Sequence, residues 1–157
     1  SILSILRTEG VSIEEINDHV RAEVAQAFDS RAMAQSVLST NWRAASEEQQ
    51  NEFESLFAET LENTYIGRLE AYTNETVEYL KEEITNTRST VDTLIVTGSV
   101  DIPIGYKLRL RSDGWYVYDV EVENISMVSS YRDTYRSIVR RSGMDGLINQ
   151  MREQLSE

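Results

Sequence analysis

The chain contains no cysteine, which excludes disulfides, thiolate metal sites and a cysteine nucleophile. It has one histidine, His19, on an acidic helical pattern, and a ligand or triad histidine would need convergent partners that the sequence does not offer. We therefore expect a surface or packing role for His19. The seven glycines are scattered, so no phosphate-binding glycine loop is formed. We expect neither a metal site nor a cofactor.

Long hydrophobic runs and positive charge are also scarce. No stretch approaches the length of about 18 apolar residues that a membrane-spanning helix needs. The beginning, SILSILRTEG, lacks the basic start and small-residue cleavage site of a signal peptide, so an exported protein would have lost its leader. With 15 basic and 27 acidic residues the net charge is −12. We expect no nucleic-acid binding and no spontaneous adsorption to anionic membranes, because both need clustered lysine and arginine.

The residues that are present predict one domain over 1–157, because this length and a hydrophobic content of 40% suffice for a core. Capping-box patterns at 12–15 and 46–49 mark two helix starts, and Asp29 or Ser30 caps a short helix between them. The helix that starts at Ser46 should reach about Tyr72 and be roughly 35–40 Å long. A helical turn is expected over 2–9, before the first capped helix.

In the second half the hydrophobic period changes from helical spacing to two, which predicts strands. In the clearest one, Ile104 and Leu108 should face inward while Lys107 and Arg109 face water. Short links make neighbouring strands antiparallel, and Asp113-Gly114 is a hairpin signal. The expected strands lie near 75–84, 90–98, 102–111 and 115–123.

Two helices, about 127–142 and 144–155, should close the chain on either side of Gly143. The order of helices, four strands and helices is typical of an α+β domain. We predict a curved four-stranded antiparallel sheet that is covered by several helices, one of them long, with an apolar cavity between them.

Several stretches resemble the MlaC-type, or toluene-tolerance, family. W-x-V-Y-D-V-x-V at 115–122 and I-S-M-V-x-x-Y-R at 125–132 resemble its signature, and matches at 28–49, 53–72 and 143–148 keep the same order, so the resemblance covers roughly 28 to 155. The family usually has glycine where this chain has Asn124. We expect Asn124 to preserve the turn, because asparagine tolerates a left-handed backbone better than other non-glycine residues.

The resemblance implies a periplasmic protein that holds the acyl chains of a phospholipid between its sheet and helices. It further implies that an outer-membrane lipoprotein complex and an inner-membrane ABC transporter with its lipid-binding subunit are the partners. The phospholipid would be cargo, carried by a monomer to maintain outer-membrane lipid asymmetry. We expect the cavity to be lined by Met33, Val37, Leu38, Trp42, Phe53, Phe57, Leu61, Tyr65, Leu69, Ile104, Tyr106, Leu108, Leu110, Tyr118, Val120, Met127, Val128 and Tyr131.

Two other functions fit the same pattern. A cone-shaped pocket with Asp119 and the tyrosines Tyr106, Tyr116 and Tyr118 could serve an isomerase-like enzyme by acid–base chemistry. We favour a structural role for Asp119, as a hydrogen-bond acceptor at a turn or helix end. The third possibility is a ligand-free periplasmic adaptor whose groove is filled by its own side chains.

Overall fold

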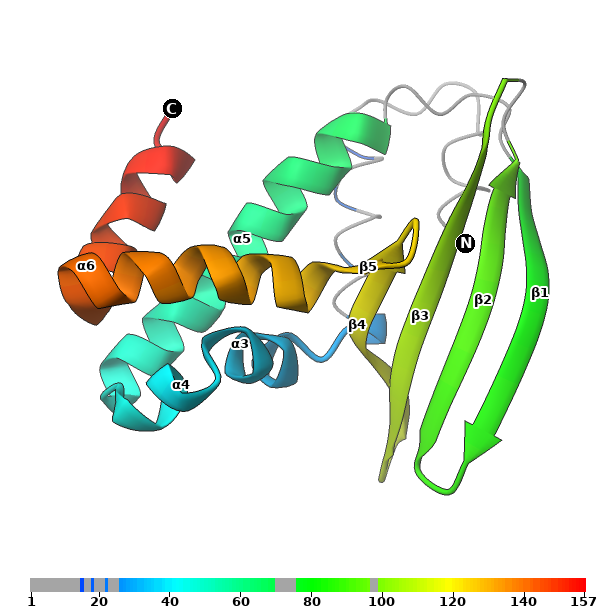
Figure 1. Cartoon of the computed structure of the whole chain (residues 1–157), viewed down its shortest axis with the longest axis horizontal. Helices are drawn as coiled ribbons and strands as arrows, with labels where there is room; N and C mark the ends of the chain where they lie inside the picture. The colour runs from blue at the N-terminus through cyan, green and yellow to red at the C-terminus, as the bar shows by residue number, and fades with distance from the viewer. Residues whose placement is uncertain (1–14, 16–17, 19–21, 23–25, 70–75, 97–98) are drawn as a thin grey trace.

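The computed structural model describes residues 15, 18, 22, 26–69, 76–96 and 99–157, with only the backbone at 65–69 and 76 (Figure 1). The expected turn at 2–9, the capping box at 12–15, His19 and the last residues of the predicted long helix lie outside this part of the chain.

Within it the fold is α+β, as predicted. The helices are α3 (Ser30–Leu38), α4 (Thr40–Ala44), α5 (Glu47–Leu69) and α6 (Met127–Leu155). The strands are β1 (Thr76–Thr85), β2 (Arg88–Val96), β3 (Asp101–Arg111), β4 (Gly114–Val122) and β5 (Ile125–Ser126). The strands form one antiparallel sheet in the order β1-β2-β3-β4-β5. The two-residue β5 is an addition to the four strands that the sequence predicts.

The helix boundaries follow local capping chemistry. Asp29 caps α3 by accepting a hydrogen bond from the backbone N–H of Ala32 at 3.0 Å. Ser46 and Gln49 form the predicted capping box, with reciprocal hydrogen bonds of 2.9 and 3.2 Å. Gly143 interrupts α6 with φ 72° and ψ −179°, a conformation that is essentially restricted to glycine, so the predicted separation of two closing helices is confirmed.

The turn between β4 and β5 explains how the chain does without the glycine that the MlaC-type pattern usually has there. Val122 pairs with Ile125, and the two residues between them, Glu123 and Asn124, have φ of 52° and 66°. Positive φ at both central positions is the pattern of a type I′ turn, whose twist matches that of paired strands. Asn124 therefore keeps the turn, as expected.

The strand register separates the sheet into two chemically different faces. Tyr106 lies between Val91 and Val120, so these three side chains share one face. We call it the apolar face; on β2, β3 and β4 it carries Val91, Ile95, Ile102, Ile104, Tyr106, Leu108, Leu110, Trp115, Val117, Val120 and Val122. The opposite face carries Arg88, Lys107, Arg109, Asp119 and Glu121 and is called the polar face.

The sheet is bent, as the strands in Figure 1 show. Register shifts occur between Tyr79 and Lys81 in β1 and opposite Lys107 and Leu108 of β3. A bulge of this kind bends its strand and increases the local twist. The bulge in β4 also changes which side chains share a face, which matters for the site below.

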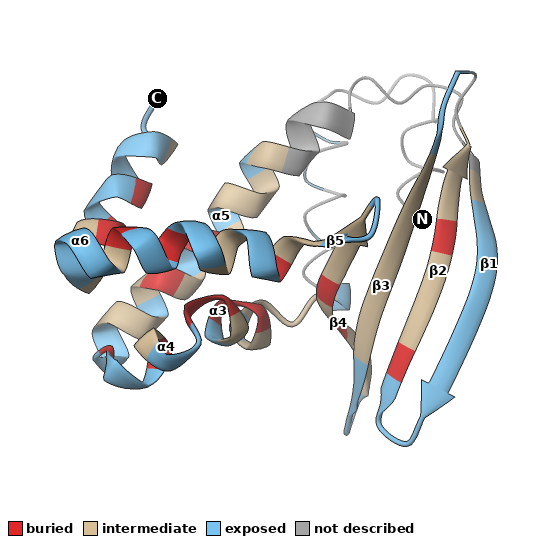
Figure 2. Cartoon of the chain, viewed as in Figure 1, coloured by how far each residue is buried: buried red, intermediate tan, exposed pale blue. Residues whose placement is uncertain are grey.

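The main core of the described part lies among the helices. α3, α5 and α6 pack on one another, and their extensive contacts with the sheet are at β4 and β5 (Figure 1). Figure 2 shows most of the buried positions in these helices and others on β2 and β4, while β1 is almost entirely exposed. The described helices therefore contact the sheet mainly at β4 and β5.

Candidate functional site

The residues predicted to line a cavity fall into two groups. The first belongs to the helical core: seven are buried there and three more are partly buried against them. The buried ones are Met33, Val37, Leu38, Trp42, Phe53, Phe57 and Val128, and the partly buried ones are Leu61, Met127 and Tyr131. Tyr65 and Leu69 lie on α5, but their side chains are outside the described part of the chain.

Aromatic rings hold this helical core together. Phe53 stacks on Phe57 with a centroid distance of 5.7 Å and meets Tyr135 edge-on at the same distance. Phe57 meets Tyr131 edge-on at 5.3 Å. These are the preferred geometries of aromatic pairs. The hydroxyl of Tyr135 is buried with this core, and burial raises its pKa because it disfavours the charged form.

The second group lies on the sheet. Ile104, Tyr106, Leu108 and Val120 are on the apolar face and are half-buried, whereas Leu110, near the end of β3, is 41% exposed. Among the described elements no helix packs extensively against β2 or β3. The apolar side chains of this face are mostly half-buried, and the buried polar residues Ser89 and Thr93 of β2 lie among them. Apolar patches on proteins usually mark binding surfaces, which makes this face a candidate site for an apolar ligand.

Tyr118 is placed apart from both groups. Lys107 pairs with Asp119 and Leu108 pairs with Val117, so Tyr118 is the extra residue of the β4 bulge. Its ring lies under two guanidinium groups of the polar face, those of Arg88 and Arg109 (5.7 and 5.5 Å).

The geometry around Asp119 argues against an acid–base site. The carboxylate of Asp119 is buried and accepts hydrogen bonds from Ser126 Oγ (2.5 Å), Val120 N (2.8 Å) and Val128 N (3.1 Å). Val128 is in the first turn of α6, whose N-terminus favours a negative charge. The oxygens that would take a substrate proton are therefore already occupied by the fold.

The tyrosines do not complete such a site either. The hydroxyl of Tyr116 donates to Asp113 Oδ2 at 2.6 Å, which lowers the pKa of the Asp113 carboxyl and raises that of Tyr116. Tyr106 lies on the opposite face of the sheet from Asp119.

The described part of the chain contains no group of three or more His, Cys, Asp or Glu side chains that could hold a metal ion. None of its helices has the length and hydrophobicity that a membrane span requires.

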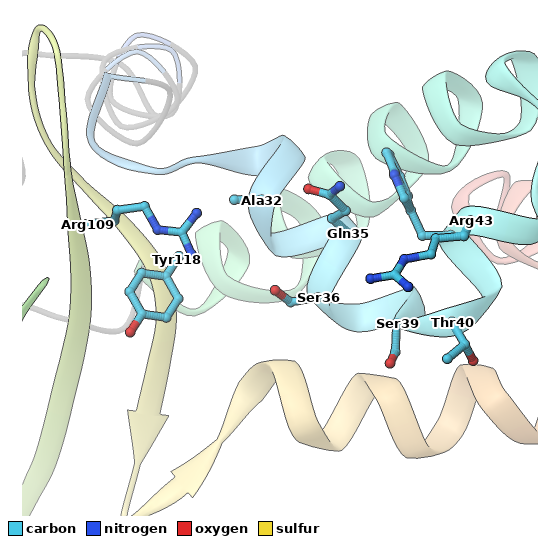
Figure 3. Close-up of a pocket in the computed structure, with 9 residues that line it drawn as sticks. Ala32, Gln35, Ser36, Ser39, Thr40, Arg43, Arg109 and Tyr118 are labelled. Atoms are coloured by element: carbon cyan, nitrogen blue, oxygen red, sulfur yellow. The ribbon is translucent and has the colours of Figure 1, made fainter. Parts of the chain in front are cut away.

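A second surface, which the sequence did not reveal, is a cleft of about 300 Å³. It lies where α3 and α4 approach the polar face of the sheet at β3 and β4 (Figure 3). We call it the arginine cleft; it is lined by Ala32, Gln35, Ser36, Ser39, Thr40, Trp42, Arg43, Arg109 and Tyr118. The alternation of Lys107, Arg109 and Arg111 marked a water-facing row, but only the fold brings Arg43 to the same cleft.

Ser39 sets the course of the chain along the arginine cleft. It ends α3 and precedes α4 with φ 53° and ψ −122°, a strained conformation for a residue other than glycine. The reversal lets the five-residue α4 place Arg43 on the cleft and Trp42 in the core. The guanidinium of Arg31 lies over the Trp42 ring, 5.1 Å from its centroid.

Comparison with known proteins finds a match to the model of one family, described as MlaC protein, over residues 1–153. A curated relative, the intermembrane phospholipid transport system binding protein MlaC of Haemophilus influenzae, is 25% identical over 127 residues. That match covers 77% of this chain, which spans only 59% of the relative's length.

Among solved structures, the phospholipid-binding protein of Ralstonia solanacearum, determined in complex with a phospholipid, has the same fold. Its TM-score is 0.89 at 22% identity, and the superposition covers 99% of this chain and 93% of that one.

Proposed function

Because this chain belongs to the MlaC family, we propose that it is a phospholipid carrier that holds acyl chains against the apolar face of its sheet. The observation that carries the proposal is the half-buried row of aliphatic and aromatic side chains on β2, β3 and β4, on a fold shared with a phospholipid-bound protein. The name of the Haemophilus influenzae relative supports transport between membranes as the role.

The energetics of lipid transfer explain why such a carrier needs a large apolar surface. Two acyl chains hold roughly thirty CH₂ groups, and exposing them to water would cost over 20 kcal/mol at about 0.8 kcal/mol each. The carrier does not have to exceed the affinity of a bilayer, which already buries the chains. A predominantly apolar surface with few polar groups is sufficient.

The charge of the protein supports delivery through partner proteins. At a net charge of −12 the surface is repelled by anionic lipid, so lipid should be exchanged at docked complexes and not at bare membrane. We propose that these are the outer-membrane lipoprotein complex and the inner-membrane ABC transporter of the Mla type, and that the protein acts in the periplasm as a monomer. The name of the Haemophilus influenzae relative, which describes intermembrane phospholipid transport, supports exchange between two membranes.

The direct test is lipid extraction. We expect organic extracts of the protein purified from bacteria to contain phospholipid, at a molar ratio that native mass spectrometry gives from the mass of the intact complex. A protein of similar size and acidity, purified in parallel, is the control. If several preparations contained no more phospholipid than this control, the carrier function would be wrong, and a ligand-free adaptor would become the better interpretation.

The apolar face can be tested separately with Leu108→Trp. If the face receives acyl chains, the added ring has room in the lipid-free protein and displaces lipid, so bound phospholipid should fall while the unfolding midpoint of delipidated protein hardly changes. If Leu108 is packed as core, overpacking should instead destabilise the protein by about 1–3 kcal/mol. Ser112→Trp, in the exposed turn between β3 and β4, adds the same ring away from this face and should keep its lipid.

A variant that keeps its lipid but loses stability would show that Leu108 packs in the core. Lipid would then have to lie elsewhere, for example among the helical residues that the sequence predicts as cavity lining.

A further inference from the structure

We propose that the arginine cleft is a docking site for an extended acidic segment of a partner protein. The chain has 27 acidic residues among 157, yet none of the residues that line the cleft is acidic. Two of them, Arg43 and Arg109, come from opposite walls, α4 and β3. The cleft is therefore lined by positive and neutral side chains, whereas the protein as a whole has a net charge of −12.

The arginines of the cleft are available for a ligand. Elsewhere on this side of the molecule cations are neutralised: Arg31 pairs with Glu54 at 2.9 Å and Arg111 with Asp29 at 2.7 Å. Within the part of the chain that the structure describes, no carboxylate pairs with Arg43, with Arg109 or with Arg88, the neighbour of Arg109 on β2.

Tyr118 prepares one end of the cleft for carboxylate binding. Arg88 and Arg109 both lie over its ring, which holds two like charges side by side where they would otherwise repel. Arginine presents a planar fork of donors that matches a carboxylate, and stacking on an aromatic ring leaves this fork free. The extra residue of the β4 bulge thus organises a pair of guanidinium groups on the polar face.

The shape of the cleft favours an extended occupant. Figure 3 shows Arg109 at one end and Arg43 at the other, with Gln35 and Ser36 of α3 between them. Because the two arginines lie at opposite ends of the cleft, a segment with spaced Asp or Glu side chains can place a carboxylate at each of them. Gln35, Ser36 and Ser39 offer polar groups to its backbone.

The overall negative charge makes this interaction selective. At physiological ionic strength charges more than about 8 Å apart are largely screened, so repulsion from the rest of the surface is weak while contact pairs in the cleft persist. An acidic partner that misses the cleft meets a surface of negative net charge, although that surface includes exposed arginines such as Arg140 and Arg141. The cleft therefore favours an acidic segment that lies along it over acidic surfaces that cannot enter it.

The test uses a fluorescein-labelled ten-residue peptide in which glutamate alternates with serine, and the same peptide with glutamine for glutamate. We expect the wild-type protein to bind the glutamate peptide at least tenfold more tightly than the glutamine peptide in fluorescence anisotropy. The double variant Arg43→Gln/Arg109→Gln should lose at least tenfold in affinity. Arg140→Gln/Arg141→Gln removes the same charge from exposed positions of α6 outside the cleft and should stay within twofold of wild type.

Amide chemical shifts of the wild-type protein locate the bound peptide without any variant. We expect titration to move the amides of Gln35, Ser36, Ser39 and Thr40 most. Four results would each overturn the proposal: no measurable binding, equal losses in both double variants, shifts confined to other surfaces, or displacement of the peptide by millimolar inorganic phosphate.

A lipid surface or a second copy of the chain as occupant would also contradict it. The first would appear as cleft-dependent binding to phosphatidylglycerol vesicles with no binding of the peptide, and the second as a dimer that the cleft variant dissociates. Because the cleft is on the polar face, its variant should retain bound phospholipid. Lipid content per protein therefore separates a failure of this docking site from a failure of the carrier function.

Discussion

Replacing Asp119 with asparagine is expected to lower the free energy of unfolding by about 2–3 kcal/mol, although the side chain hardly changes in size. Its carboxylate accepts three hydrogen bonds, from Val120 N, Ser126 Oγ and Val128 N, and is buried. An amide would turn its NH₂ group toward one of these donors. Losing hydrogen bonds to a charged group costs about 1.5–3 kcal/mol, and the helix α6 also loses the negative charge at its N-terminus.

Urea unfolding of delipidated protein measures the effect, with Asp113→Asn as the matched control. Asp113 is exposed and its carboxylate accepts a hydrogen bond from the hydroxyl of Tyr116, so its exchange should leave the midpoint within experimental scatter. An Asp119→Asn protein that unfolds at the wild-type midpoint would contradict the structural role and return attention to the enzymatic alternative.

Most of the elements could be predicted because their signals are local. The period of two in the stretch 102–111 follows from alternation of side chains across a sheet, and β3 spans Asp101–Arg111. The capping box at 46–49, the break at Gly143 and the left-handed Asn124 each depend on the backbone chemistry of a few neighbouring residues.

The face of Tyr118 could not be predicted in this way. Strict alternation puts Tyr118 and Val120 on one side of the strand, but the bulge inserts one residue, so that Val120 joins Val117 on the apolar face. Nothing in the pattern of 115–122 distinguishes a bulged strand from a regular one. A bulge depends on the register with β3, which is a tertiary property.

The sequence also could not predict which elements each helix packs against. An apolar stripe on a helix identifies its inward side but does not say whether a sheet or another helix lies against it. α5 packs against α3 and α6, and both α3 and α6 adjoin β4. The arginine cleft depends on the same arrangement, since Arg43 and Arg109 are 66 positions apart in the chain and share a cleft only through the packing of α3 and α4 beside the sheet.

Phe53→Ala is expected to have the largest effect, a loss of about 3–5 kcal/mol in the free energy of unfolding of the lipid-free protein. Phe53 has no exposed surface, and its ring stacks on Phe57 and meets Tyr135 edge-on. Removing the ring leaves a cavity among α3, α5 and α6, and these packed helices cannot easily move to close it. The sequence places Phe53 among the residues that line a lipid cavity, so the two roles predict different outcomes for one variant.

If Phe53 is part of the core, Phe53→Ala loses stability whether or not lipid is present. Phe53→Leu should then lower the free energy of unfolding by a smaller but measurable amount. Leu56→Ala, one turn along α5 and half-buried, is the comparison and should cost about 1–2 kcal/mol, because part of its side chain already faces water. If Phe53 instead lines a cavity that acyl chains fill, delipidated Phe53→Ala should unfold near the wild-type midpoint while its phospholipid content falls. Unfolding curves of delipidated protein, paired with lipid per protein by mass spectrometry, distinguish the two. The aromatic stacking leads us to expect the first result, which would restrict the lipid surface to the apolar face of the sheet.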